Sequence, residues 1–429
     1  MSNAAEARPG RFERDLQYYK FCAYGFLKNL RFYEPFLMLF FLEKGLTFAQ
    51  IGVLYAVREV FINVSEIPSG LLADTLGRRL TMVISFVAYI AAFLIFYSAA
   101  EFWVLLLAMV AYAFGDAFRT GTHKAMIFDY LSSKGWSSLR THYYGHTRAW
   151  SQRGAAISAL IAGGLVLWHR SYAPIFLFTI IPYVLDLILI MTYPRNLDGP
   201  RHTSDKTVRD EFAGVLRSLI ASIRNPAALR AISNQALYSG YYKACKDYLQ
   251  PMLRSLALTL PILVMLANQE RTAIITGIVY SLLYALTAVA SSRSGNLADR
   301  FSGLARPLNV TLLVGVGLGF ASGAFQHLGI PVVAVFLYLG IYVIENLRKP
   351  MGITYVSERM EQQSLASALS VESQAETLFA AGIALLLGVF SSLFGLGVGV
   401  LLVSGLCLVL GLLLRLPVEK APKTLVIEE

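Results

Sequence analysis

Residues 70–79 read Gly-Leu-Leu-Ala-Asp-Thr-Leu-Gly-Arg-Arg, and this short run decides the fold because a related run recurs later in the chain. The second copy, residues 295–303, reads Gly-Asn-Leu-Ala-Asp-Arg-Phe-Ser-Gly. Each copy lies between two long apolar segments. A repeated loop between repeated apolar segments predicts two related bundles of helices within one chain.

The composition indicates that these bundles lie in a membrane. The 429 residues are 56% hydrophobic and 15% charged, whereas a soluble domain is about 45–50% apolar and about 25% charged. The apolar residues gather in windows of about 20 residues, the length that crosses the hydrocarbon core of a bilayer. We therefore expect an all-α membrane protein with twelve transmembrane helices in two pseudo-symmetric six-helix bundles. The expected spans are residues 18–42, 51–72, 80–99, 102–128, 149–167, 173–193, 229–249, 273–290, 307–324, 331–346, 365–390 and 394–414.

Positive residues predict the orientation of the chain. Arg and Lys collect in alternate loops and in a polar stretch near the middle of the sequence, and positively charged loops stay cytoplasmic. Both termini and the central linker are then expected inside. The predicted parts are a cytoplasmic tail (1–16), a six-helix bundle (17–193), a cytoplasmic linker with an amphipathic helix at about 208–223 (194–228), a second six-helix bundle (229–415) and a cytoplasmic tail (416–429).

The repeat extends into the spans themselves. Asp116 and Arg119 in the fourth span are matched by Glu345 and Arg348 in the tenth. An acid followed three residues later by an arginine places both side chains on one helix face, one turn apart. Both pairs, together with Arg58 and its neighbour Glu59, are therefore candidates for ion pairs within the bundles.

These residues resemble the major facilitator superfamily. The loop after the second span is similar to the family's signature loop, although Thr75 stands where a basic residue is usual. The resemblance implies a carrier that alternates between outward-open and inward-open states. It also implies that this loop and its second copy form a latch between the two halves. The expected latch residues are Gly70, Asp74, Gly77, Arg78, Arg79, Asp299 and Arg300.

Charged residues within the spans indicate the cargo. A charge at the bilayer centre costs about 2.5–3.5 kcal/mol, yet spans 1, 4, 7 and 10 hold more bases than acids. In the family these four spans line the central cavity, and an excess of positive charge there is best compensated by an anionic ligand. Internal pairing that merely holds the bundle together is the alternative for any single charge, as helix packing is for any single tyrosine. The predicted substrate-binding residues are Lys28, Arg31, Glu34, Arg119, His123, Tyr238, Tyr242, Lys246 and Arg348.

The energy source is predicted to be an ion gradient, because the sequence contains no resemblance to an ATP-binding loop. A carboxylate in a partly dry cavity can take up and release a proton. His123 is a further proton-carrying candidate because an imidazole titrates near neutral pH. The predicted coupling residues are Glu59, Glu66, Asp116, Glu345, Glu372 and Glu376.

Together these observations predict a secondary active transporter that works by alternating access and moves a small anionic or zwitterionic solute with protons. The alternative is an exporter of hydrophobic or amphiphilic compounds such as drugs or lipids. An enzyme is not expected because no catalytic constellation is evident. The three cysteines lie in apolar segments without a CxxC pair, so no metal or cofactor is expected. The expected partners are the solute, protons and the lipid bilayer, without nucleic acid, for a multi-pass monomer in a bacterial inner membrane.

Overall fold

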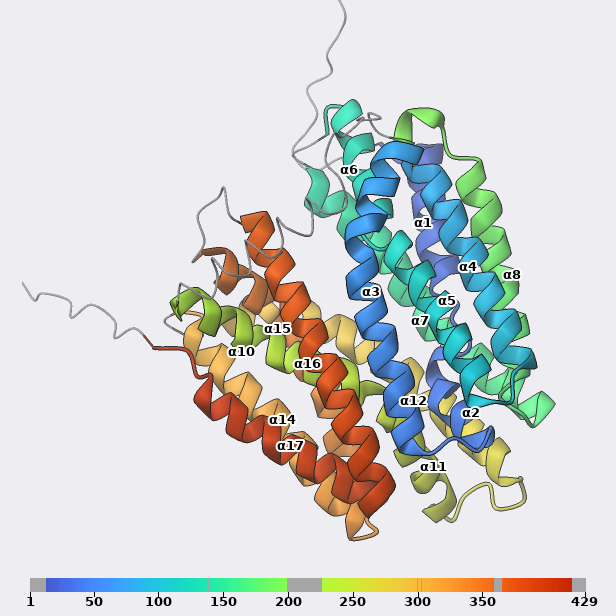
Figure 1. Ribbon diagram of the computed structural model, residues 1–429, viewed down its shortest axis with the longest axis vertical. Helices are drawn as coiled ribbons and strands as arrows, with labels where there is room; N and C mark the ends of the chain where they lie inside the picture. The colour runs from blue at the N-terminus through green and yellow to red at the C-terminus, as the bar shows by residue number, and fades with distance from the viewer. Residues whose placement is uncertain are drawn as a thin grey trace, which may run out of the picture. The chain divides into compact units, whose positions relative to one another are not determined.

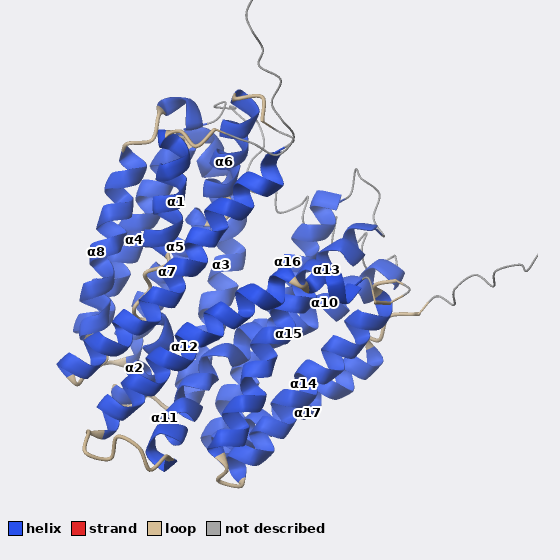
Figure 2. Ribbon diagram, turned by 180° about the vertical axis from the view of Figure 1, so that it is seen from behind, coloured by secondary structure: helices blue, strands red, loops and turns tan. Residues whose placement is uncertain are grey.

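The computed structural model describes residues 13–136, 139–198, 226–298, 300–301, 303–358 and 365–418. Every regular element in these residues is a helix, as Figure 2 shows, which confirms the all-α prediction. The chain divides into two compact units. The first comprises 1–212 with 250–285, and the second comprises 213–249 with 286–429. The division of the chain into two bundles with a linker at 194–228 stays a prediction.

The first unit is built from long helices that begin at clear signals. Asp15 caps the first helix by accepting a hydrogen bond from the Tyr18 amide at 2.9 Å. Thr47 and Gln50 form a reciprocal capping box at the start of the third helix. The helices of this unit are α1 (Leu16–Lys28), α2 (Leu37–Glu43), α3 (Phe48–Leu76), α4 (Arg78–Ser98), α5 (Phe102–Arg119), α6 (Thr122–Ser133), α7 (Arg140–His169), α8 (Pro174–Met191), α11 (Leu249–Thr259) and most of α12 (Asn268–Ser292), with short 3₁₀ turns η1 (Glu34–Phe36) and η3 (Arg195–Asp198).

Helix packing in the first unit places α1 against both α7 and α8, while α4 packs against α5 and α8 (Figure 1). The contact between α1 and α7 is close because it contains glycine. A Cβ at Gly154 would lie 2.5 Å from the carbonyl oxygen of Phe26, so only glycine allows this approach. Polar residues on the two helices are thereby held close together.

Two of the expected spans, 18–42 and 102–128, contain a break in the helix, although Phe102–Ser133 as a whole remains long and apolar enough to cross a membrane. The break in the first span follows Lys28, the last residue of α1. The next residue, Asn29, caps this helix end, and its side chain donates to the Gly25 carbonyl at 2.7 Å. The fourth breaks between α5 and α6, where Gly121 has a φ of 85°. A side chain at this φ would clash with the backbone, so glycine marks the break.

The second unit contains α10 (Pro226–Cys245), the 3₁₀ turn η4 (Lys246–Tyr248), α13 (Ser294–Ala298), α14 (Ala305–His327), α15 (Pro331–Glu358), α16 (Leu365–Phe394) and α17 (Leu396–Leu413). Here α10 packs on α16 and α15, while α14 packs on α15 and α17. One apolar cluster joins α10, α14, α15 and α16 through Ile232, Leu308, Met351 and Val371. Burial of these side chains supplies the cohesion of the unit.

Eight helical segments in the described residues are long and apolar enough to cross a membrane. The remaining expected spans fall on α1 with α2, α3, α7 and α10, which are broken or carry polar and charged residues. Residues 251–271, between the seventh and eighth expected spans, begin within the helix α11. The predicted amphipathic helix at 208–223, Asp299 and the side chain of Asp74 lie outside the described part of the chain.

Candidate functional site

A cavity of about 390 Å³ lies within the first unit, among α1, the break between α5 and α6, and α7. Three of the predicted substrate-binding residues, Lys28, Arg119 and His123, line it together. The full lining is Phe21, Tyr24, Gly25, Lys28, Asn29, Arg119, Thr120, Gly121, His123, Lys124, Ile127, Tyr144, Thr147, Arg148, Ser151 and Gln152.

The break at Gly121 turns the fourth span toward the cavity. Thr120 is extended, with φ −65° and ψ 131°, and α6 begins anew at Thr122. The first amides of α6 therefore have no carbonyl partner within their own helix. The positive end of the α6 dipole lies beside His123 and Lys124, which also line the cavity. A negatively charged group is favoured at such a helix end.

A polar stripe on α7 forms the facing wall. Tyr144, Thr147, Arg148 and Ser151 recur every three or four residues and so share one face of the helix. Hydroxyl and guanidinium groups here can donate hydrogen bonds to a solute. This periodic stripe was a sequence signal for the site, but Arg148 was not among the predicted binding residues.

The electrostatic balance of the cavity is one-sided. Lys28, Arg119, Lys124 and Arg148 line it, and none of the described lining residues is Asp or Glu. Like charges gathered in a partly buried space repel one another, and the repulsion is relieved when an anion enters. The lining therefore favours an anionic or partly anionic ligand.

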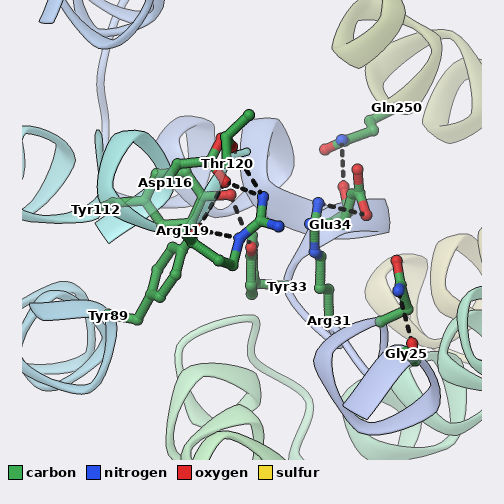
Figure 3. A network of polar contacts seen from close by, with 11 residues as sticks. Gly25, Arg31, Tyr33, Glu34, Tyr89, Tyr112, Asp116, Arg119, Thr120 and Gln250 are labelled. Carbon is green, nitrogen blue, oxygen red and sulfur yellow. Dashed lines mark hydrogen bonds and ion pairs between the residues drawn. The ribbon is translucent and has the colours of Figure 1, made fainter. Parts of the chain in front are cut away.

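Arg119 is held by a network at the cavity wall (Figure 3). Its Nη2 lies 2.6 Å from Asp116 Oδ1, which confirms the ion pair predicted from their spacing. The Tyr89 hydroxyl accepts from Arg119 Nε at 3.1 Å and donates to Asp116 Oδ1 at 2.6 Å. Arg119 Nη2 also lies 3.3 Å from Thr120 Oγ1. These contacts fix the guanidinium while leaving part of it available to a ligand.

Arg31 and Glu34 extend this network through the break that follows α1. Arg31 Nη1 lies 3.7 Å from Glu34 Oε2. The side-chain amide of Gln250 donates to the Glu34 carbonyl at 2.9 Å (Figure 3). Its oxygen accepts from the Met38 amide at 2.7 Å, and both bonds hold the backbone here. Neither Arg31 nor Glu34 is among the residues that line the cavity, so their predicted part in binding stays a prediction.

His123 lies against aromatic rings. It stacks on Tyr24 with ring centroids 3.6 Å apart, and its Nε2 lies 3.3 Å from the hydroxyl of Tyr193. Aromatic stacking and one hydrogen bond fix the orientation of the imidazole. His123 thus has a defined position at the cavity wall, which is compatible with either a structural or a proton-carrying role.

The predicted binding residues of the second unit have other surroundings. Tyr238 is fully buried, and its hydroxyl donates to the Ile341 carbonyl at 3.1 Å. Arg348 is also fully buried. In the described residues its guanidinium donates to the Asn234 and Leu308 carbonyls and forms no ion pair with Glu345, which corrects that predicted pair, although the two charges still interact electrostatically. Tyr242 packs edge-on against Tyr342, whose hydroxyl donates to the Lys246 carbonyl. A role in binding stays a prediction for all four of the predicted residues in this unit, Tyr238, Tyr242, Lys246 and Arg348.

The predicted coupling carboxylates mostly have basic partners. Glu59 accepts from its neighbour Arg58 at 2.9 Å, which confirms that predicted pair. Glu376 lies 2.8 Å from Lys243 Nζ. Ser239 Oγ donates to Glu345 Oε1 at 3.0 Å, and Lys349 Nζ lies 3.8 Å from that same Oε1. Glu372 is buried on α16, whereas Glu66 is exposed on α3.

The first copy of the repeated run, residues 70–79, forms the end of α3, a turn at Gly77 and the start of α4 within the first unit. Gly77 ends α3 with a φ of 93°, and the Arg79 amide donates to Asp198 Oδ1 at 2.9 Å. Arg79 Nη1 also donates to the Tyr193 carbonyl at 3.1 Å, and Arg78 pairs with Asp129 on α6. The arginines of the signature thus join α4 to α6 and to the segment after α8. Their predicted part in a latch between the halves stays a prediction.

One buried acid was missed by the prediction of coupling residues. Asp186 on α8 is fully buried, and neither of its carboxylate oxygens has a hydrogen-bond partner among the described residues. Lys28 and Arg119 interact with it electrostatically. An acid within an otherwise apolar span was the available sequence signal. Asp186 lies on α8, which falls on the sixth expected span and not on one of the four spans expected to line the cavity.

Comparisons with known proteins agree with the predicted fold. The family model described as the Major Facilitator Superfamily matches residues 21–371. An uncharacterized MFS-type transporter of Bacillus subtilis (strain 168), YxaM, is 22% identical over 380 residues, covering 85% of this chain and 86% of that protein.

Solved transporter structures have the same fold. The nucleoside transporter NupG superposes with a TM-score of 0.76 at 12% identity, covering 93% of this chain and 98% of that one. A bacterial homologue of the human lysosomal transporter Spinster, in an inward-facing and unoccupied conformation, gives 0.69 at 17% identity, covering 94% and 97%. The peptide transporter POT gives 0.68 at 15% identity, covering 93% and 92%.

Proposed function

The chain belongs to the major facilitator superfamily, and from that premise we propose that it is a proton-coupled secondary transporter for a small anionic or zwitterionic solute. Its family and its structural relatives are transporters and not enzymes. The named ligands of those relatives differ, with nucleosides for one and peptides for another. The solute must therefore be argued from the chemistry of this chain's own cavity.

The observation that carries the proposal is the charge of that cavity. Four cationic side chains line it without a described carboxylate among them, and the amino end of α6 lies beside them. Carboxylate, sulfate and phosphate groups fit this set because they accept several charge-assisted hydrogen bonds at once. Asn29 and Gln152 add neutral donors and acceptors that suit the remaining polar groups of a solute. A volume of about 390 Å³ suits a small molecule.

The first experiment measures binding. We expect at least one anion among monocarboxylates, dicarboxylates, amino acids, sulfate and phosphate esters to raise the melting temperature of the purified protein. Replacing a charged donor removes a contact worth about 10–100-fold in affinity. Lys28→Gln and Arg148→Gln should each weaken binding of that anion by this factor. Arg306→Gln, which removes an exposed arginine in the second unit, is the matched control.

Either of two results would overturn the proposal. One is that no anion in the panel shifts the melting temperature, and the other is that the Lys28 and Arg148 variants bind as tightly as the control. The anion with the largest shift is then followed in proteoliposomes, where an imposed inward proton gradient should drive its accumulation.

Proton coupling is assigned to Asp186 in addition to the predicted carboxylates. Its electrostatic neighbours are Lys28 and Tyr24 on α1, Arg119 on α5 and Tyr193 after α8. An anion that binds Lys28 and Arg119 offsets their positive potential at Asp186, so the carboxyl then takes up a proton more readily. Anion and proton should therefore bind cooperatively, which predicts symport.

The test of this coupling is the pH dependence of anion binding. In the wild-type protein, affinity for the anion should fall as pH rises, because deprotonated Asp186 opposes the bound anion. Asp186→Asn should bind the anion with an affinity that depends much less on pH in the same range, because a carboxyl that interacts electrostatically with Lys28 and Arg119 no longer titrates. A variant that keeps the wild-type pH profile would assign the proton to another group, such as Glu59 or Asp116, and would leave the binding proposal intact.

A further inference from the structure

A second recess lies on α1 and α7, away from the substrate cavity. It has a volume of about 270 Å³ and is lined by Arg14, Tyr18, Tyr19, His146, Trp150 and Arg153. No step of the proposed transport uses it. Two helices thus supply basic and aromatic side chains to one small surface hollow.

The recess opens on the outer face of α7. The substrate cavity uses Tyr144, Thr147 and Arg148, whereas the recess uses His146, Trp150 and Arg153. With 3.6 residues per turn, these two sets project from opposite faces of the helix. Since one face is turned to the inside of the bundle, the other is turned to its surroundings.

The outer face of α7 continues as an apolar stripe. Ile157, Leu160, Ile161 and Trp168 follow at helical spacing and are 43%, 51%, 41% and 80% exposed. Trp150 and Trp168 are separated by about 27 Å at 1.5 Å per residue, close to the hydrocarbon thickness of about 30 Å. Tryptophans at both ends of an exposed apolar stripe mark the two interfaces of a bilayer. The recess around Trp150 therefore lies at the level of the lipid headgroups.

The charge of the recess selects among headgroups. Arg14, His146 and Arg153 are exposed, and none of the six described lining residues is an acid. Asp15, beside Arg14, is held elsewhere, because its carboxylate caps α1 and accepts from Tyr130. The Arg153 guanidinium lies over the Trp150 ring at 5.0 Å, which fixes its position at the recess.

We propose that the recess on α1 and α7 binds the phosphate headgroup of an anionic phospholipid. Arg14 and Arg153 contact the phosphate, while Tyr19 and Trp150 lie along the glycerol and upper acyl chains. The exposed stripe from Ile157 to Trp168 covers the rest of the chain. Because α1 and α7 also line the substrate cavity, a lipid in this recess would stabilise the packing of the two helices that carry Lys28 and Arg148.

The test uses native mass spectrometry of the purified full-length protein in a mixture of phosphatidylglycerol and phosphatidylcholine. Wild-type protein should retain phosphatidylglycerol preferentially. Retention should fall about fivefold for each arginine removed in Arg14→Ala and Arg153→Ala. Arg153→Lys should stay near wild type because it keeps the charge. Arg293→Ala removes an exposed arginine far along the chain and should have no effect.

Two further results decide the source and the place of the ligand. A phosphatidylglycerol analogue with a photoreactive headgroup should crosslink to wild-type residues 13–20 or 144–155, a readout that needs no variant. Equal retention of the two lipids, or crosslinks confined to other segments, would overturn the proposal. Displacement of the lipid by millimolar inorganic phosphate would also overturn it, because the site would then be one for a free anion.

Discussion

Arg119 in the first unit and Arg348 in the second occupy equivalent positions of the internal repeat, each three residues after an acid, yet their surroundings differ. Arg119 pairs with Asp116 at 2.6 Å and lines a cavity. Arg348 is 0% exposed and donates to the carbonyls of Leu308 and Asn234 on neighbouring helices. One arginine lines a cavity, and the other joins α15 to α14 and α10 through hydrogen bonds.

The position two residues further on explains the difference. Gly121 follows Arg119 and breaks the fourth span, whereas Pro350 follows Arg348 inside an unbroken α15. The break ends α5 at Arg119 and opens the backbone beside it to the cavity. The continuous helix carries Arg348 into the packed interior of its unit. A repeated sequence pattern therefore need not repeat a function, because local backbone geometry decides what the side chain meets.

The largest expected effect comes from removing the buried arginine. Arg348→Met removes the buried guanidinium that donates to the carbonyls of Leu308 and Asn234 and to the Asn234 side chain, and should lower the free energy of unfolding by about 3 kcal/mol or more. Arg119→Met should have a smaller effect on stability and should instead abolish the melting shift given by the bound anion. Thermal melts of both variants with and without that anion make the comparison. Equal losses of stability would contradict the distinction between the two sites.

A second prediction exchanges the residues that set the helix geometry. Gly121→Ala places a Cβ at a φ of 85° and should cost about 1–2 kcal/mol of stability, together with weaker anion binding. Pro350→Ala should be neutral or stabilising, because alanine restores a backbone donor that proline lacks. Effects of the same sign on melting temperature in the two variants would argue against the role given to these positions.

The smallest expected effect concerns the two copies of the signature loop. Asp198→Asn weakens the hydrogen bond from the Arg79 amide at 2.9 Å and should destabilise the first unit by about 1 kcal/mol. Arg300→Gln in the second copy removes an exposed charge and should leave the melting temperature unchanged. If Asp198→Asn melts at the wild-type temperature, the turn at Gly77 does not depend on this carboxylate.

Much of the cavity could be predicted because its signals are local. Lys28, Arg119 and His123 were predicted from charge within apolar spans, and the Asp116–Arg119 pair followed from helical spacing. Arg148 and Asp186 were missed for different reasons. Arg148 was missed because α7 falls on the fifth expected span, which was not one of the four spans expected to line the cavity. Asp186 becomes notable only through its complete burial and missing hydrogen-bond donors, which depend on the helices around it.

The sequence by itself determined the family, the helical class and the kind of charge available to the solute, because composition and spacing act over one helix or one loop. The tertiary structure alone decided which cations share a cavity and which crosslink a bundle. It also shows which contacts the repeated run makes. Arg78 forms an ion pair with Asp129, and the Arg79 amide donates to the Asp198 carboxylate. Pairing across distant segments depends on helix breaks and on close packing at glycine, and neither is visible in a periodic pattern.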